Sequence, residues 1–133
     1  MSGRLRDDRG SAVVEFSLIT VLLVFLLLAV LQVAALFYVR SVASAGAADG
    51  ARYGANANVD PVAGGARASS VIAHGIGASL ANQLPCTGGS VTDPDSGLVT
   101  SQVQCRGRIK SLLLPIGAFV RIEVTARSLK DPP

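Results

Sequence analysis

The residue whose chemistry is most conspicuous is a glutamate at the start of a long apolar run. Glu15 stands in the stretch RGSAVVEFSLITVLLVF, residues 9–25, six positions after the last arginine before the run. An ionised carboxylate this close to membrane hydrocarbon is costly, and polar groups at such depth are usually functional. A cationic partner would offset that cost. The position of Glu15 therefore raises the question of which positive charge can reach it.

The two cysteines form the second informative pair. Cys86 and Cys105 have 18 residues between them, and the chain contains no other cysteine. In an oxidising compartment this pair predicts a disulfide, whose loop would contribute about 3 kcal/mol in the chain-entropy model. The alternative is two unpaired cysteines in a core, which gains weight if this part of the chain stays in the cytoplasm.

Catalytic and metal chemistry find little support in the residue pattern. The single histidine, His74, lacks a serine or cysteine motif that would supply a nucleophile, and it lies far from the cysteines. The stretch DPDSG, residues 93–97, resembles the start of a calcium loop but lacks the later glutamate, so it predicts a turn. We expect no enzyme, no cofactor and no metal site.

The apolar run itself predicts one transmembrane helix. Residues 16–39 carry no formal charge, and as a helix they would span roughly 36 Å, enough to cross the ~30 Å hydrocarbon core of a bilayer. Arg4, Arg6 and Arg9 precede the run, whereas Arg40 alone follows it closely. The positive-inside rule then predicts a single-pass protein of the cytoplasmic membrane with its N-terminus inside and its C-terminus exported.

The net charge of +3 does not predict a nucleic-acid partner, because the basic residues are scattered. The nearest approach to a cluster is CRGRIK, in which Arg106, Arg108 and Lys110 alternate along the chain. Such alternation is typical of the solvated face of a strand. Acidic lipid headgroups or a partner protein are the alternatives for this segment.

Small residues follow the apolar run. The stretch SVASAGAADGARYGANAN, residues 41–58, is rich in Ala, Gly and Ser and predicts a helical stalk that frays after Gly54. Gly46, Gly50 and Gly54 recur every four residues, which places them on one face as a packing surface for another helix. A turn at 58–65 should end the stalk.

The remaining residues predict a small α+β module. Residues 66–84 show helical spacing of Val71 or Ile72, Ile76, Leu80 and Leu84, which predicts a short amphipathic helix ended by Pro85. After a loop at 85–97, two alternating segments predict a β-hairpin whose connection is SLLLPIG, residues 111–117. Its apolar faces are Val99, Val103 and Cys105, then Val120, Ile122, Val124 and Ala126. Residues 128–133 are expected to form a flexible tail.

Spacing around the glutamate resembles that of a known family. The pattern is similar to the processing site of type IV prepilins, because Gly10 is followed by four residues and then by Glu15 and Phe16. The pair of a glutamate and an aromatic residue is similar to that of the tight-adherence (Tad, or Flp) branch. The longer stretch from residue 9 to 56, including AADGARYGA at 47–55, resembles the TadE-like minor pilins or pseudopilins.

This resemblance implies a processing and assembly reaction. A prepilin peptidase would cut between Gly10 and Ser11, and the new amine of Ser11 would pair with Glu15 within a chain or between neighbouring subunits. The implied domains are a leader at 1–10, a transmembrane assembly helix and stalk at 11–57, and an exported module at 58–127. The implied partners are other pilin subunits, the Tad membrane platform and membrane lipid. Since 123 residues would remain after cleavage, more than is usual for the major subunit of this branch, a minor subunit is implied.

Two other classes stay open. One is an uncleaved single-pass anchor that presents a small extracytoplasmic binding module, with Glu15 incidental. The other is a secreted module released after Ala45, where Ala43-Ser44-Ala45 offers a small-residue cleavage site.

Overall fold

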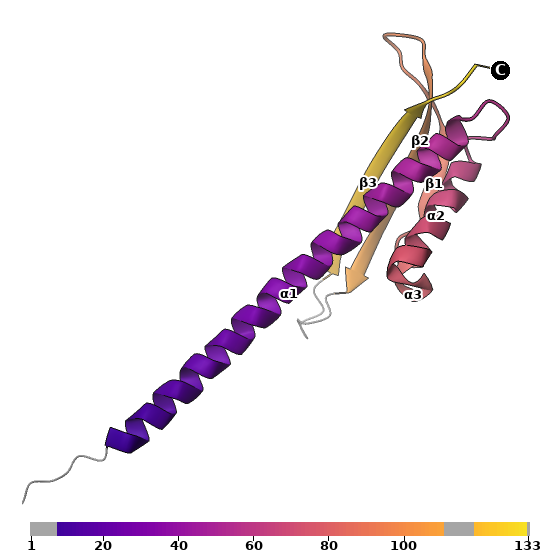
Figure 1. Cartoon of the computed structure of the whole chain (residues 1–133). Helices are drawn as coiled ribbons and strands as arrows, with labels where there is room; N and C mark the ends of the chain where they lie inside the picture. The colour runs from indigo at the N-terminus through magenta and orange to yellow at the C-terminus, as the bar shows by residue number, and fades with distance from the viewer. Residues whose placement is uncertain (1–7, 111–118, 133) are drawn as a thin grey trace, which may run out of the picture. The chain divides into compact units, whose positions relative to one another are not determined.

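The computed structural model of the chain describes residues 8–110 and 119–132. Its fold is α+β, as the sequence predicts (Figure 1). The elements in chain order are α1 (Asp8–Ala55), α2 (Ala63–Ile76), α3 (Ala78–Ala81), β1 (Cys86–Thr92), β2 (Val99–Lys110) and β3 (Phe119–Leu129). The start of the predicted leader, residues 1–7, and the predicted connection at 111–117 lie outside the described residues.

The chain divides into two compact units, Met1–Ala35 and Leu36–Pro133. In the first unit the described residues belong to α1 alone, whose large apolar side chains are exposed. The second unit contains the last part of α1 and all the other described elements. Each unit therefore has a different surface chemistry, apolar in the first and mixed in the second.

The long helix α1 follows from its composition. Residues 16–39 contain neither Gly nor Pro and are rich in Leu, which is a strong helix former. The small-residue stalk continues the same helix to Ala55, one residue beyond the predicted fraying point at Gly54.

The sheet has three antiparallel strands in the order β1-β2-β3. In the hairpin of β2 and β3, Val103 lies opposite Ala126 and Cys105 opposite Val124, so the predicted apolar faces coincide. Alternate residues of β2 are buried while their neighbours reach solvent, which indicates that the helices cover only one face of this sheet. Val99 is the exception, because it begins the strand and is exposed.

Strand β1 corrects the sequence prediction of a loop at 85–97. The segment CTGGSVT shows no apolar alternation, and we expected two strands for this reason. Pairing with β2 forms the third strand, from Cys86 opposite Cys105 to Thr92 opposite Val99. Gly88 also allows β1 to pass close to α2, since an added Cβ would lie 2.7 Å from the Gly65 nitrogen.

The predicted amphipathic helix at 66–84 is divided in two. α2 ends at Ile76 because Gly77 has φ +85°, a value in the region that favours glycine, and the short helix α3 follows. The helical spacing continues through the break, so Ile72 and Leu84 both reach the core. Periodicity identified the buried side chains but not the kink.

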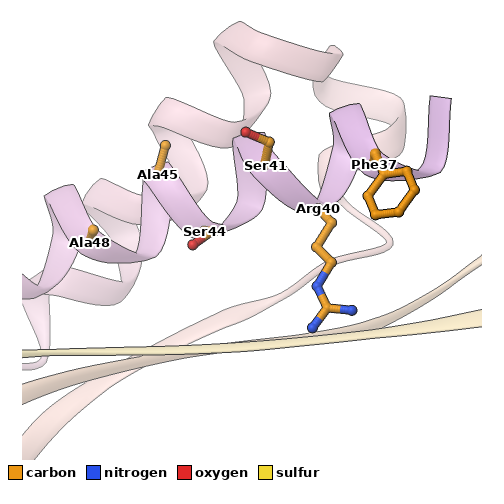
Figure 2. A pocket seen from close by; sticks show the side chains of 6 residues that line it. All are labelled: Phe37, Arg40, Ser41, Ser44, Ala45 and Ala48. Carbon is orange, nitrogen blue, oxygen red and sulfur yellow. The ribbon is translucent and has the colours of Figure 1, made fainter. Parts of the chain in front are cut away.

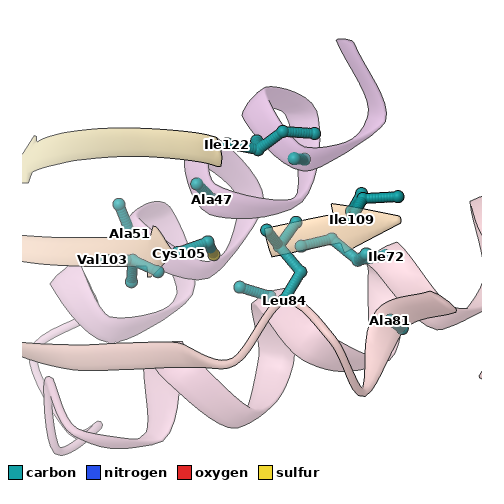
Figure 3. Close-up of a cluster of buried hydrophobic side chains, with 11 residues drawn as sticks. Ala47, Ala51, Ile72, Ala81, Leu84, Val103, Cys105, Ile109 and Ile122 are labelled. Atoms are coloured by element: carbon teal, nitrogen blue, oxygen red, sulfur yellow. The ribbon is translucent and has the colours of Figure 1, made fainter. Parts of the chain in front are cut away.

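The core of the second unit is built largely from small side chains (Figure 3). Alanines on the helices pack with a few branched residues from α2, from the segment before β1 and from the sheet. The buried members are Ala43, Ala47, Ala51, Ala68, Ala81, Ile72, Leu84, Val103, Cys105, Ile109 and Ile122. Small side chains let backbones approach closely, so the unit gains packing without large buried aromatic residues.

Candidate functional site: the N-terminal helix and the module it carries

The residues of the predicted processing site lie in the first turns of α1. The described part of α1 starts at Asp8, so the bond between Gly10 and Ser11 follows its third residue.

Glu15 and Phe16 are exposed on α1, with Phe16 at 71% of its full exposure. Ser11 and Glu15 are four residues apart, which places them on one face about 6 Å apart along the helix axis. The helix therefore brings Ser11 and Glu15 together, whereas Phe16 projects from the neighbouring face.

The surface of the apolar run is adapted to a nonpolar surrounding. Two of its hydroxyl groups are satisfied within the helix, because Ser17 donates to the Val13 carbonyl oxygen at 2.9 Å and Thr20 to that of Phe16 at 2.8 Å. In the described part of the chain, one helix, over Ser11–Ala55, is long and apolar enough to cross a membrane. An apolar surface of this extent requires a membrane or partner helices to cover it.

The glycine face of the stalk packs α2 of the same chain. A Cβ added to Gly46 would lie 2.6 Å from a side-chain carbon of Ile72, and one added to Gly50 would lie 2.9 Å from the Ala68 Cβ. Gly54 faces Pro61 and Ser101 instead. The predicted packing surface thus exists, and its partner is α2 together with the start of β2.

A second face of the stalk remains open. Figure 2 shows a shallow depression on α1 lined by Phe37, Arg40, Ser41, Ser44, Ala45 and Ala48. All six residues lie on one helix, and the depression is wide open to solvent. It offers neither enclosure nor a cluster of polar groups, which a small-molecule site requires.

The cysteines form the predicted disulfide. Cys86 and Cys105 are direct cross-strand partners in β1 and β2, with their Cα atoms 4.1 Å apart. Cys105 is buried in the core and Cys86 is half-buried. The bond therefore fixes β1, which the sequence did not predict as a strand, to the central strand of the sheet.

His74 and the DPDSG segment take structural roles. The Nδ1 atom of His74 lies 2.7 Å from the Ser70 carbonyl oxygen, one turn earlier in α2. In the turn after β1, the Asp95 N–H and the Ser96 hydroxyl both donate to the Asp93 carboxylate and lower its pKa. The segment is thus a turn held by its own side chain, as predicted.

The outer face of the β2–β3 hairpin carries most of the charge of the module. Arg106 donates to Glu123 at 3.0 Å and Arg127 to Gln102 at 2.9 Å. Nearer to Lys110, at the end of the hairpin, the basic residues of the described strands form no ion pair with a carboxylate. The exposed charges agree with the predicted solvated strand face. The strand register also shows how these charges are distributed over that face, which the sequence did not reveal.

Lys130 makes contacts that the sequence did not predict. β3 extends to Leu129, two residues into the predicted flexible tail, and Lys130 follows it directly. The Lys130 ammonium donates to three backbone carbonyl oxygens at and just after the end of α1, those of Gly54 at 3.5 Å, Asn56 at 3.3 Å and Val59 at 3.0 Å. A cation at a helix C-terminus is favourable. Nothing in the sequence around this lysine indicated that it would lie there.

Comparison with known proteins places the N-terminal helix. The sequence model of the family described as TadE-like protein matches residues 10–52, about a third of the chain. Neither the curated proteins nor the solved structures gave a match to the chain. The matched segment begins at Gly10 and contains Glu15, Phe16 and almost all of α1. Over residues 10–52 the chain is therefore similar to the TadE-like family, whose members are structural components of the Tad pilus system.

Proposed function

We propose that this protein is a minor pilin or pseudopilin of Tad pilus assembly, processed by a prepilin peptidase between Gly10 and Ser11. The observation that carries this proposal is the TadE-like match from residue 10 onwards, over a helix whose apolar side chains are exposed. A surface of that kind suits a subunit that first lies in a membrane and then packs against the helices of other subunits.

Cleavage would create the cation that Glu15 lacks. The new α-amino group of Ser11 is largely protonated at neutral pH. It would stand four residues before Glu15 on α1, within reach of that carboxylate or of the carboxylate of a neighbouring subunit. In a nonpolar surrounding an unpaired charge is expensive, so subunits in the wrong register would strand two charges. The pairing thus supplies a rule for assembly.

The second unit fits an exported location. A disulfide between Cys86 and Cys105 is favoured by an oxidising compartment. Arginines before the apolar run favour a cytoplasmic N-terminus. Both observations support a subunit with its leader inside, its module outside, and the other pilin subunits and the Tad platform as its partners.

The decisive experiment is to determine the N-terminal residue of the protein recovered from membranes. We expect Ser11. Met1 would replace the proposal with an uncleaved single-pass anchor, and a start near Gly46 would replace it with a secreted module. A Gly10→Leu variant is the matched control, because it should accumulate as the uncleaved chain; normal processing of that variant would exclude a prepilin peptidase.

A further inference from the structure

One end of the β2–β3 hairpin carries a cluster of arginine and lysine side chains on the outer face of the sheet. The basic strand-end patch consists of Arg108 and Lys110 on β2 and Arg121 on β3, and all three residues are exposed. Arg108 lies directly opposite Arg121, and Lys110 lies opposite Phe119. Residues 108 and 110 share a face because strand side chains alternate.

The charges of this patch are not balanced within the protein. Two like charges directly opposite each other on neighbouring strands are unfavourable. Two cross-strand pairs further along, on the same face, Arg106 forms an ion pair with Glu123 at 3.0 Å. Within residues 11–110 and 119–132 no carboxylate forms an ion pair with the patch. An arrangement that is unfavourable in the free protein is explained if an anion binds there.

The level at which the patch lies beside α1 indicates the source of that anion. The start of β2 is fixed at the end of α1, where Gly54 packs against Ser101. Figure 1 shows β2 running back beside α1 from that end. From Ser101 to Lys110 the strand covers about 30 Å. Residues 36–54 of α1 cover about 27 Å. The patch therefore lies level with residues near Leu36, where the apolar run 16–39 ends.

We propose that the basic strand-end patch binds the phosphates of anionic lipid headgroups in the membrane that α1 enters. Arginine suits this partner because its planar guanidinium donates two hydrogen bonds to one phosphate. The attraction of basic residues to an anionic membrane acts within a Debye length, about 8–10 Å at physiological ionic strength. This proposal rests on α1 being a membrane helix, as the proposed function requires, but not on cleavage after Gly10.

The test uses the full chain, labelled with ¹⁵N, in micelles of a neutral detergent. Short-chain phosphatidylglycerol is titrated into the micelles, with phosphatidylcholine of equal chain length and inorganic phosphate as separate arms. We expect saturable shifts of the Gly107 and Lys110 amide resonances with phosphatidylglycerol alone. These shifts should weaken in about 0.5 M NaCl, where the Debye length is short.

Two variants locate the binding. In the R108Q/R121Q variant the half-saturation concentration should rise about tenfold or more, since each basic residue near an anionic surface contributes roughly a fivefold factor. The control R52Q/R127Q removes the same charge at the other end of the module and should bind as the wild type does.

Three results would overturn the proposal. The first is an absence of saturable shifts with phosphatidylglycerol. The second is equal shifts with inorganic phosphate, which would make free phosphate the ligand. The third is equal weakening of binding in R52Q/R127Q, which would show a response to net charge alone. None of these results bears on the N-terminal residue, so the failure of this proposal and that of the proposed function are distinguishable.

Discussion

At the scale of single residues, Glu15 and Lys130 both concern the ends of α1. Glu15 is an anion in the first turns of the helix, and Lys130 is a cation at its last turn. The sign of Lys130 agrees with the helix dipole, which favours cations at the C-terminus, whereas Glu15 lies beyond the first turn, over which the dipole favours anions. The two residues differ in their partner, which for Lys130 is the backbone and for Glu15, in the proposed function, would be the amine that cleavage creates at Ser11.

Replacing Glu15 by Ala should separate processing from assembly. In the proposed function the peptidase would recognise the bond after Gly10, so we expect the N-terminus at Ser11 in the variant as well. Pilus assembly should fall about tenfold or more, because a buried unpaired amine costs several kcal/mol. Electron microscopy and immunoblots of sheared pili measure assembly. Glu15→Asp, which keeps the charge, is the control, and normal piliation of Glu15→Ala would rule out the amine–carboxylate pairing.

Replacing Lys130 by Met should destabilise the second unit while leaving its sheet intact. The substitution keeps most of the apolar stem but removes three hydrogen bonds to carbonyl oxygens, and we expect a loss of about 1 kcal/mol. Urea unfolding of the full chain in a mild detergent measures it. Lys110→Met, at an exposed position, is the matched control. Equal stability of both variants would show that the Lys130 contacts contribute nothing.

At the scale of elements, the contact between α1 and α2 determines how the stalk is used. Gly50 faces the backbone carbonyl of Gly64 and the Ala68 side chain, so the two helices approach closely at this point. The sequence indicated a glycine face, and the structure shows that α2 occupies it. In the proposed assembly, the face of the stalk that would remain for neighbouring subunits is the open one around Ser44 and Ala48.

Gly50→Ala should therefore destabilise the unit although alanine is the better helix former. The intrinsic gain of about 1 kcal/mol is opposed by a clash with the α2 backbone, and overpacking of this kind costs typically 1–3 kcal/mol. We expect a net loss of up to about 2 kcal/mol, measured by urea unfolding. Ser44→Ala on the open face should be neutral or slightly stabilising. A more stable Gly50→Ala variant would contradict the close approach.

The elements also show what sequence reasoning can and cannot reach. The apolar run predicted α1 because its length suits a membrane helix, and alternation predicted β2 and β3 because one face of each strand packs on the core. Strand β1 was missed because its sequence, CTGGSVT, shows no apolar alternation, and the strand is formed by its pairing with β2. The kink at Gly77 and the Lys130 contacts were missed because both depend on tertiary placement. Of the candidate site, Gly10, Ser11, Glu15 and Phe16 were predicted from spacing and resemblance, and their roles stay predictions.

At the scale of the whole molecule, the two units depend on different surroundings. The described part of Met1–Ala35 is a helix that must be covered by lipid or by other helices. Leu36–Pro133 has its own core, but that core consists mainly of alanines and a few branched side chains. Small domains with modest cores are marginally stable and are commonly reinforced by covalent links. Here the link is the disulfide between β1 and β2.

Reduction of the Cys86–Cys105 disulfide should lower the free energy of unfolding by about 3 kcal/mol, as expected for a loop of this length. The measurement compares urea unfolding of the full chain in a mild detergent with and without a reductant. A Cys86→Ala/Cys105→Ala variant should match the reduced protein and should not respond to the reductant. If the wild-type midpoint is insensitive to reduction, the disulfide does not stabilise this module.

The same bond would have a mechanical consequence if the protein is placed under tension in a pilus, as the proposed function allows. A pull on the two ends of the chain cannot extend the segment between Cys86 and Cys105, which are 19 positions apart. About 60 Å of contour length is thereby withheld from stretching. The β1–β2 hairpin stays a closed loop even when the strands around it separate, so a pulled subunit should yield less slack and retain a template on which its sheet can reform.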